Sequence, residues 1–132
     1  MAYLFDASSL VKALKLRRAD LLAKNYIQWL TIYEVLNALW KDVHLLKAIP
    51  EDRMMEFVKV LRQITDFMNV LEIKGLEEEV LRVAMQLGIT AYDSSYIVLA
   101  REHELSLVTE DDKLRAKAEG LVRCVSIEGL IP

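Results

Sequence analysis

The chain of 132 residues has little of what defines several special classes of protein. One cysteine, two prolines and four glycines exclude a disulfide scaffold, a collagen-like repeat and a Gly- or Pro-rich disordered segment. The single Cys124 cannot form an internal disulfide, and its place in the apolar run 121–127 predicts a small buried residue rather than a nucleophile. This cysteine usage fits a reducing, cytoplasmic environment.

Long apolar runs are also absent. The longest ones, such as residues 96–100, are far shorter than the roughly 18 residues that a membrane-spanning helix needs. Asp6 interrupts any signal-like start. No internal repeat, low-complexity tract or linker marks a boundary, so we expect a single domain over residues 1–132 that does not interact with a membrane.

Neither sign of charge is in large excess. Seventeen Lys and Arg stand against twenty Asp and Glu, and the net charge of −3 argues against a protein that coats nucleic acid with a basic surface. It does not argue against a nuclease, because carboxylates that hold divalent cations make the balance acidic. The positive mean hydropathy predicts a sheet covered on both faces or a large partner interface.

The pattern of apolar residues predicts strands that alternate with helices. Short apolar runs predict strands over residues 2–5, 26–30, 69–73, 105–109 and 121–127. Helical spacing predicts helices over residues 8–14, 32–43, 51–68, 76–87 and 112–119. Segment 94–104 fits a strand or a fully buried helix by periodicity alone, and we favour the helix. The alternation predicts an α/β fold with a central, mainly parallel sheet flanked by helices.

Four acidic residues stand where predicted strands end or predicted helices begin. Asp6 and Asp111 follow strands, whereas Glu34 and Asp93 open helices. In an open parallel sheet these passages gather at the edge formed by the carboxyl ends of the strands, where such folds bind ligands. We therefore expect the four carboxylates to converge on one pocket.

Helix capping offers a simpler explanation for acids near helix starts. Thr31, Thr90 and Thr109 each stand three residues before an acid, which is the spacing of a capping box. Capping does not require convergence, and convergence is costly, because two unit charges about 4 Å apart repel by roughly 4 kcal/mol at an effective dielectric of 20. A shared pocket therefore needs cations, and Mg²⁺ or Mn²⁺ suits a donor set of carboxylates alone.

Other catalytic chemistries lack the residues that they need. His44 and His103 lie near predicted helix ends, which is typical of solvated side chains that interact with the helix dipole. Ser8 and Ser9 have no histidine partner and no glycine elbow, and the scattered glycines build no phosphate-binding loop. A receiver-like signalling module would need a second acid after the first strand, where only Asp6 stands.

Four segments in order carry a resemblance to a known family: 4–8, 31–39, 90–96 and 107–114. They read Leu-Phe-Asp-Ala-Ser, Thr-Ile-Tyr-Glu-Val-Leu-Asn-Ala-Leu, Thr-Ala-Tyr-Asp-Ser-Ser-Tyr and Leu-Val-Thr-Glu-Asp-Asp-Lys-Leu. The chain resembles a PIN domain over essentially its whole length and is most similar to the short prokaryotic ribonuclease toxins of the VapC type. The resemblance implies a three-layer PIN-like fold and a Mg²⁺- or Mn²⁺-dependent endoribonuclease that hydrolyses RNA phosphodiester bonds.

The resemblance also implies roles for individual residues. The acidic quartet of the family maps onto four positions that would hold the metal and support catalysis: Asp6, Glu34, Asp93 and Asp111. Ser8 and Thr109 would supply polar support beside the metal. Whether one or two ions act is left open.

Residues 110–112 are three consecutive acids, so two residues are candidates for the fourth member of the quartet. The family pattern Thr-x-Asp-x-x-Leu selects Asp111. If the loop is displaced by one residue, Asp112 becomes the inward acid and Asp111 its cap.

Partners follow from the resemblance as well. It implies RNA as substrate, a homodimer and a VapB-type antitoxin that wraps a hydrophobic groove and blocks the acidic pocket. A PIN-fold protein that binds RNA or a partner without cutting is the alternative to a nuclease. Basic residues after the first motif are either an ordinary solvated surface or a rim for RNA phosphates: Lys12, Lys15, Arg17 and Arg18.

The large apolar side chains on the predicted helices are expected to be mostly core. They are Trp29, Trp40, Met54, Met55, Phe57 and Met68. Some of them are candidates for a partner interface.

Overall fold

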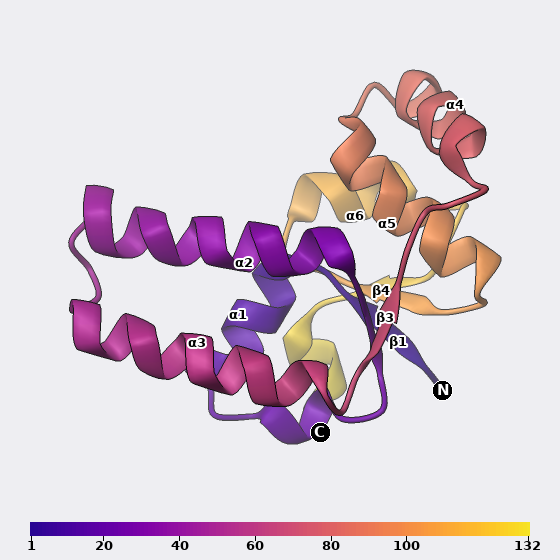
Figure 1. Ribbon diagram of the computed structural model, residues 1–132. Coiled ribbons are helices and arrows are strands. Elements are labelled where there is room, and N and C mark those ends of the chain that lie inside the picture. The colour runs from indigo at the N-terminus through magenta and orange to yellow at the C-terminus, as the bar shows by residue number, and fades with distance from the viewer.

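The computed structural model describes all residues, 1–132, as strands that alternate with helices (Figure 1). The strands are β1 (Tyr3–Phe5), β2 (Tyr26–Gln28), β3 (Asn69–Leu71), β4 (Ser106–Val108) and β5 (Cys124–Val125). The α-helices are α1 (Ala7–Lys15), α2 (Trp29–Trp40), α3 (Glu51–Thr65), α4 (Glu77–Leu87), α5 (Ala91–Glu102) and α6 (Asp112–Ala118). Shorter helical turns are η1 (Ala19–Leu21), the π-helical η2 (Lys41–Leu45) and η3 (Ile127–Leu130).

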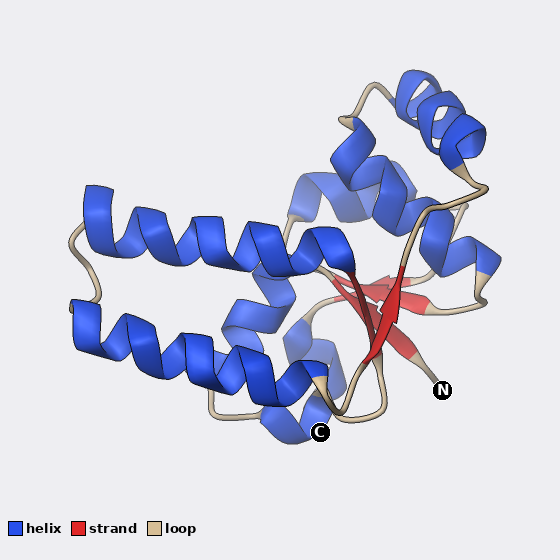
Figure 2. Cartoon of the chain, viewed as in Figure 1, coloured by secondary structure: helices blue, strands red, loops and turns tan.

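All five strands are parallel, in the order β3-β2-β1-β4-β5, and they form the small central sheet of Figure 2. The chain first builds outward from β1 through β2 to β3 and then crosses to the other side of β1 for β4 and β5. The order therefore reverses between β1 and β4, whose paired residues run from Tyr3 and Ser106 to Phe5 and Val108. In open parallel sheets, such a reversal opens a crevice at the carboxyl ends of the two strands.

Helices cover both faces of the sheet. Successive side chains of a strand point to opposite faces, so neighbouring residues of β1 and β4 enter different cores. Leu4 and Leu107 pack with residues of α4, α5 and α6, whereas Phe5 and Val108 pack with residues of α1, α2 and α3. All four side chains are fully buried. The predicted α/β fold with a covered parallel sheet is confirmed, and it has three layers (Figure 1).

The predicted helix over 94–104 is confirmed as part of α5, and its burial explains the missing periodicity. Every residue from Ser94 to Ala100 is buried, because α5 lies against the sheet on one side and against α4 on another. A helix that is covered on most sides shows no polar face. No helix of the structure combines the length and the apolar character that crossing a membrane requires.

The predicted strand over 121–127 is wrong in extent, since β5 holds only Cys124 and Val125. The backbone N–H of Leu121 still bonds back to Ala118 in the turn after α6, and Ser126 already caps η3 through its hydroxyl. Cys124 lies on the edge strand and is half-buried rather than buried, and this burial raises the pKa of its thiol to about 11.

Of the three threonines in the capping explanation, only one is the N-cap of a helix. Thr90 does cap α5, because its hydroxyl accepts a hydrogen bond from the N–H of Asp93. Helix α2 begins at Trp29, so that Thr31 is its third residue and its hydroxyl accepts from the N–H of Gln28 at 3.2 Å. Helix α6 is capped by the carboxylate of Asp111 and not by Thr109. Helix α1 is likewise capped by Asp6, ahead of the expected serine start.

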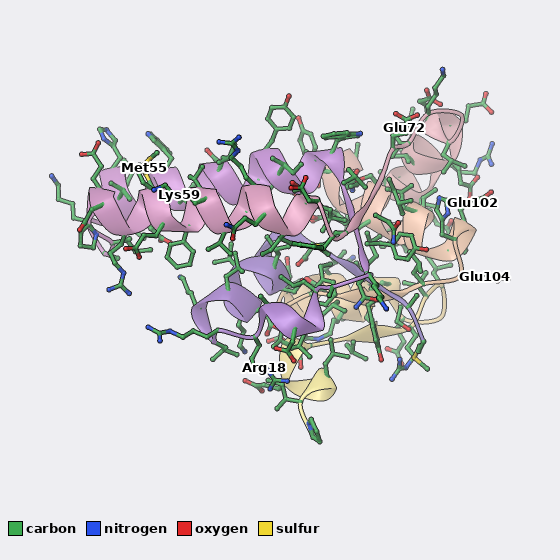
Figure 3. The ribbon with its side chains drawn as sticks, turned by 60° about the horizontal axis from the view of Figure 1, so that its bottom comes forward. Arg18, Met55, Lys59, Glu72, Glu102 and Glu104 are labelled. Atoms are coloured by element: carbon green, nitrogen blue, oxygen red, sulfur yellow. The ribbon has the colours of Figure 1, made fainter.

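Several large apolar side chains that were expected in the core are exposed. Trp29, Trp40 and Met55 are exposed, whereas Met68 is buried and Met54 and Phe57 are half-buried. For Trp40 and Met55 the reason is that α2 and α3 extend together beyond the sheet, so only their inward stripes are covered (Figure 1). Trp29 is the first residue of α2 and directly follows β2, so this reason does not apply to it. Figure 3 shows Met55 on this projecting pair of helices.

We expect Gly88→Ala to destabilise the fold by about 1 kcal/mol, because Gly88 ends α4 at φ 66°, where a residue with a Cβ is strained. No atom lies within 4 Å of the added Cβ, so the loss is conformational. The measurement is a lower urea midpoint with an unchanged m-value. Gly129→Ala is the control, since its new Cβ would only make an ordinary contact at 3.7 Å with Val125. Equal losses in the two variants would contradict this explanation.

Candidate functional site

A pocket of about 640 Å³ opens where the chain leaves the carboxyl ends of β1 and β4. Its walls come from one face of α1, one face of α2 with the start of η2, the start of α5 and the loop before α6. The four acids that the sequence singles out all line it: Asp6, Glu34, Asp93 and Asp111. The sheet order thus brings together residues that lie up to 105 positions apart in the chain.

Asp6 is the deepest of the four, with only 7% of its surface exposed. One carboxylate oxygen accepts hydrogen bonds from the N–H of Ser9 at 2.9 Å and from the hydroxyl of Ser8 at 2.7 Å. The other oxygen accepts from the hydroxyl of Thr109. Burial nevertheless raises the pKa of Asp6, because the loss of water outweighs these hydrogen bonds. The carboxylate is thus fixed in orientation and retains a strong demand for positive charge.

Ser8 and Thr109 join the two strands at the reversal point. Their hydroxyl oxygens lie 3.4 Å apart, and both bond to Asp6. The hydroxyl of Ser8 accepts from the N–H of Glu110 at 3.0 Å, and that of Thr109 accepts from the N–H of Asp111 at 3.2 Å. The two residues therefore position the loop that carries Asp111, as well as Asp6 itself.

Ser9 strengthens the same junction, and the sequence analysis gave it no role there. It is fully buried, and its hydroxyl lies 2.7 Å from the carbonyl oxygen of Val108 and 3.0 Å from Asp6. A single hydroxyl proton serves these acceptors, so Ser9 bridges the end of β4 to the start of α1.

The carboxylate of Glu34 is held by a chain of two hydroxyl groups, from Tyr96 on α5 and Thr31 on α2. The hydroxyl of Tyr96 donates to the Glu34 carboxylate at 2.6 Å, and the hydroxyls of Tyr96 and Thr31 lie 2.9 Å apart. Tyr96 is buried, and its burial beside Glu34 raises the pKa of its phenol, so the phenol stays a donor. The sequence placed Tyr96 in a buried helix but gave no signal for this contact.

Asp93 and Asp111 differ in how they are held. The backbone N–H of Asp93 donates to the hydroxyl of Thr90. The carboxylate of Asp93 accepts no hydrogen bond, and it faces the pocket unpaired. The carboxylate of Asp111 accepts from the N–H groups of Lys113 at 2.9 Å and Leu114 at 3.1 Å, and it also lines the pocket. Capping and a place in the acidic pocket are therefore compatible in one residue.

The four carboxylates repel one another. Burial is the largest cause of the raised pKa of Asp93, and the negative charges of Asp111 and Asp6 raise it further. Burial likewise raises the pKa of Glu34, opposed by Tyr96 and reinforced by the charges of Asp6 and Asp93. Glu34 and Asp93 thus each feel the negative charge of other carboxylates in the pocket, which is typical of a site that favours a cation.

Asp112, the alternative to Asp111, points away from the pocket. Its side chain is 90% exposed and pairs with the guanidinium of Arg115 three residues on. The helix geometry explains the difference, because Asp111 is the N-cap of α6 and Asp112 is its first residue, turned outward.

The four predicted rim residues do not share one surface. Only Lys15 lines the pocket, where its ammonium lies 3.7 Å from Asp42. Lys12 is occupied by ion pairs with Glu110 at 3.2 Å and Glu128 at 3.0 Å.

The two arginines of that set lie elsewhere. Arg18 pairs with Asp20 near η1 and is labelled in the lower part of Figure 3. Arg17 borders a separate hollow next to α3. The sequence could not separate these cases, because the direction of each side chain depends on where α1 ends.

Several pocket residues were missed by the sequence analysis: Tyr33, Asn37, Lys41 and Tyr92. Two of them, Asn37 and Lys41, could have been found, because they stand three and seven residues after Glu34 along α2 and its continuation η2. Residues at these intervals share a face of an α-helix. Tyr92 directly precedes Asp93, and its place is decided by the start of α5.

The carboxylate oxygens of the pocket suit a hard divalent cation, but the protein side chains alone would not complete its ligand shell. Carboxylate oxygens are the only charged donors deep in the pocket. No group of three or more His, Cys, Asp or Glu side chains is arranged to hold a metal ion. Mg²⁺ is commonly bound by one or two carboxylates with several waters and substrate phosphate oxygens, and the pocket offers this arrangement.

Comparison with known proteins agrees with the geometry. The model of the PIN domain family matches residues 1–120. Among curated proteins, exonuclease VapC9 of Pyrobaculum aerophilum is 38% identical over 131 residues, covering 91% of this chain and 88% of that protein. Ribonuclease VapC3 of the same organism is 31% identical over 96 residues, covering 70% of each chain.

A solved structure gives the same result for the fold. The crystal structure of PAE2754 from Pyrobaculum aerophilum matches with a TM-score of 0.79 and 33% sequence identity, covering 98% of this chain and 92% of that one. The predicted three-layer fold and the family resemblance are therefore confirmed. The chain belongs to the PIN domain family, and its relatives place it with the VapC-type members of that family.

Proposed function

We propose that the protein is a Mg²⁺- or Mn²⁺-dependent endoribonuclease and the toxin of a toxin–antitoxin pair. The observation that carries the proposal is the acidic pocket, in which four carboxylates from separate parts of a PIN domain line one cavity. The relatives are named as nucleases, one as an exonuclease and one as a ribonuclease.

The acidic quartet would hold the metal. Asp6 and Asp93 are the principal candidate ligands, since Asp6 is fixed at the reversal point and Asp93 presents an unpaired carboxylate. Glu34 and Asp111 would complete or orient the site directly or through waters. A bound divalent cation makes water more acidic and stabilises the charge that develops on phosphate and on the leaving oxygen.

The remaining work falls to the chain itself. Ser8 and Thr109 keep Asp6 in one orientation, and Tyr96 does the same for Glu34. Groups that are fixed before substrate arrives need no reorganisation during the reaction. Polar support by Ser8 and Thr109 is therefore part of the proposal.

A second cavity, away from the acidic pocket, supports the proposal of an antitoxin partner. A cavity of about 420 Å³ between α2 and α3 is lined mostly by apolar side chains, and Leu36 and Trp40 beside it are exposed. This groove fits the expectation of a VapB-type antitoxin. A homodimer remains a prediction, and light scattering of the purified chain would test it.

The proposed activity predicts cleavage of single-stranded RNA with Mg²⁺ or Mn²⁺ and none with chelator. Asp93→Asn should lower the cleavage rate by at least about 100-fold, because the stabilisation supplied by a metal is worth several kcal/mol. Asp112→Asn is the matched control, since that carboxylate is exposed to solvent, and its rate should be unchanged.

A covalently closed circular RNA distinguishes the modes of cutting in the same assay. An endonuclease converts the circle to a linear product, whereas an exonuclease of the kind named for VapC9 leaves it intact. Cleavage that resists chelator, or full activity in Asp93→Asn, would refute the proposal. Tight RNA binding without any cleavage would favour the non-catalytic alternative.

The carboxylate repulsion predicts that Asp93→Asn stabilises the metal-free protein. The raised pKa of Asp93 means that its ionised form is disfavoured in the folded chain, so stability is lost as pH rises through that pKa. At pH 7 in chelator, we expect the Tm to rise by roughly 1–3 °C, since partial solvent screening leaves well under 1 kcal/mol. At a pH below the carboxylate pKa values, the difference should vanish.

The control for this measurement is an acid with the opposite pKa shift. Arg18 lowers the pKa of Asp20, so Asp20→Asn should not stabilise the chain. Mg²⁺ or Mn²⁺ should raise the Tm of the original protein more than that of Asp93→Asn. A lower Tm for metal-free Asp93→Asn would contradict the repulsion.

The hypothesis of a basic rim that binds RNA phosphates now concerns Lys15 and Lys41, because these are the basic residues that line the pocket. In an Asp93→Asn background that keeps RNA intact, Lys15→Gln and Lys41→Gln should each reduce the slope of log K against log salt by about 0.7. Lys59→Gln is the control, since this exposed lysine of α3 lies outside the pocket (Figure 3). Unchanged slopes for both pocket lysines would end the hypothesis.

A further inference from the structure

Two exposed tyrosines stand at the acidic pocket. The chain has five tyrosines: Tyr3 and Tyr26 are half-buried and Tyr96 is buried. Tyr33 and Tyr92 are the exposed ones, at 72% and 63%, and both line the pocket. Isolated exposed aromatic residues are ordinary on protein surfaces, but here all the exposed tyrosines share one cavity.

Each of these tyrosines is placed by a helix directly beside a carboxylate. Tyr33 precedes Glu34 on α2, and Tyr92 precedes Asp93 on α5. The backbone of Tyr92 is fixed further, since its carbonyl accepts the hydroxyl of Ser95 at 2.6 Å. The two rings thus come from different walls of the pocket and are carried by regular structure rather than by loops.

The α2 wall has a definite order of chemistry along its length. Leu30, Tyr33 and Asn37 on α2 and Lys41 at the start of η2 line the pocket at intervals of three or four residues, so one continuous helical face forms the wall. This face is about 16 Å long, at 1.5 Å per residue. It passes from an aromatic ring beside the carboxylates to an amide and then to a cation, a sequence that suits a base, a sugar–phosphate and a further phosphate.

We propose that Tyr33 and Tyr92 are stacking platforms for the nucleobases on either side of the scissile phosphate. The inference rests on the proposed nuclease function and adds the residues that would hold the unpaired bases of a single-stranded RNA. Aromatic rings stack on any base, because every base has a π-face, and the bases of a duplex are already stacked on each other. A tyrosine also tolerates water when no substrate is present, since its hydroxyl is polar.

Binding of a short single-stranded RNA tests the proposal. The measurement uses the Asp93→Asn protein with Mg²⁺, so that the RNA stays intact. Tyr33→Ala and Tyr92→Ala should each raise the Kd by roughly 5- to 150-fold, the range measured for loss of one base–aromatic stack. Tyr→Phe at either position should retain binding within about 2-fold, because the ring is kept.

Phe67→Ala is the matched control, since Phe67 is 68% exposed and lies outside the pocket. Its Kd should not change. An equal loss in Tyr→Phe and Tyr→Ala would assign the effect to the hydroxyl and overturn the stacking proposal. An unchanged Kd in both alanine variants would also overturn it, including the case in which they lose a protein partner instead.

A double-mutant cycle with abasic RNA identifies the contact directly. One base is removed at each position next to the mapped cleavage site, and the cost is measured with and without each tyrosine. Stacking predicts that the cost of the missing base disappears when its tyrosine is already alanine. Additive costs at every position would overturn the inference.

The cycle separates this inference from the proposed function. If the original protein cuts RNA with metal but the costs are additive, only the stacking inference fails. If it cuts nothing, the nuclease proposal fails, while the binding cycle still decides whether bases stack on the two rings. Failure to bind any single-stranded RNA would overturn both.

Discussion

A buried carboxylate at the point where the sheet order reverses is the constraint on which the site depends. Asp6 follows β1 and is bonded to Thr109, which follows β4, so one side chain ties together the two strands that flank the crevice. The same carboxylate caps α1 through Ser9. Removing it from water costs free energy that its hydrogen bonds offset only in part. A cation bound beside the Asp6 carboxylate would therefore be favourable at the centre of the fold.

The other three acids line the same pocket, and they differ in how firmly their side chains are held. Glu34 is fixed by Tyr96 from the core beneath, and Asp111 is fixed by the first turn of α6. Asp93 is held only through its backbone. Fixed and adaptable carboxylates in one pocket suit an ion that keeps part of its water shell, since the ion sets its own geometry with the adaptable ligand. The accumulated negative charge is a cost to stability that serves binding.

Periodicity and local chemistry were enough to predict the order of strands and helices, and they failed where two explanations gave the same local pattern. The spacing from Thr109 to Asp112 matches a capping box, yet Asp111 caps α6, because the helix begins at Asp112 and the hydroxyl of Thr109, which donates to Asp6, accepts from the N–H of Asp111 instead. Trp40 and Met55 have the spacing of core residues, yet they are exposed where α2 and α3 outrun the sheet. In both cases a contact between distant segments, or its absence, decided the outcome.

The sequence alone determined the alternation of strands and helices, the four acids at their junctions and the family, because each is written in residues close together in the chain. Tertiary structure decided which groups meet. The strand order brings Asp6 to Thr109 across 103 residues, and the placement of α5 against the sheet brings Tyr96 to Glu34. Tertiary structure also decided that Lys12 forms ion pairs with Glu110 and Glu128, whereas Lys15 lines the pocket. These outcomes depend on directions of side chains that only a folded backbone fixes, since one residue of shift on a helix turns a side chain by about 100°.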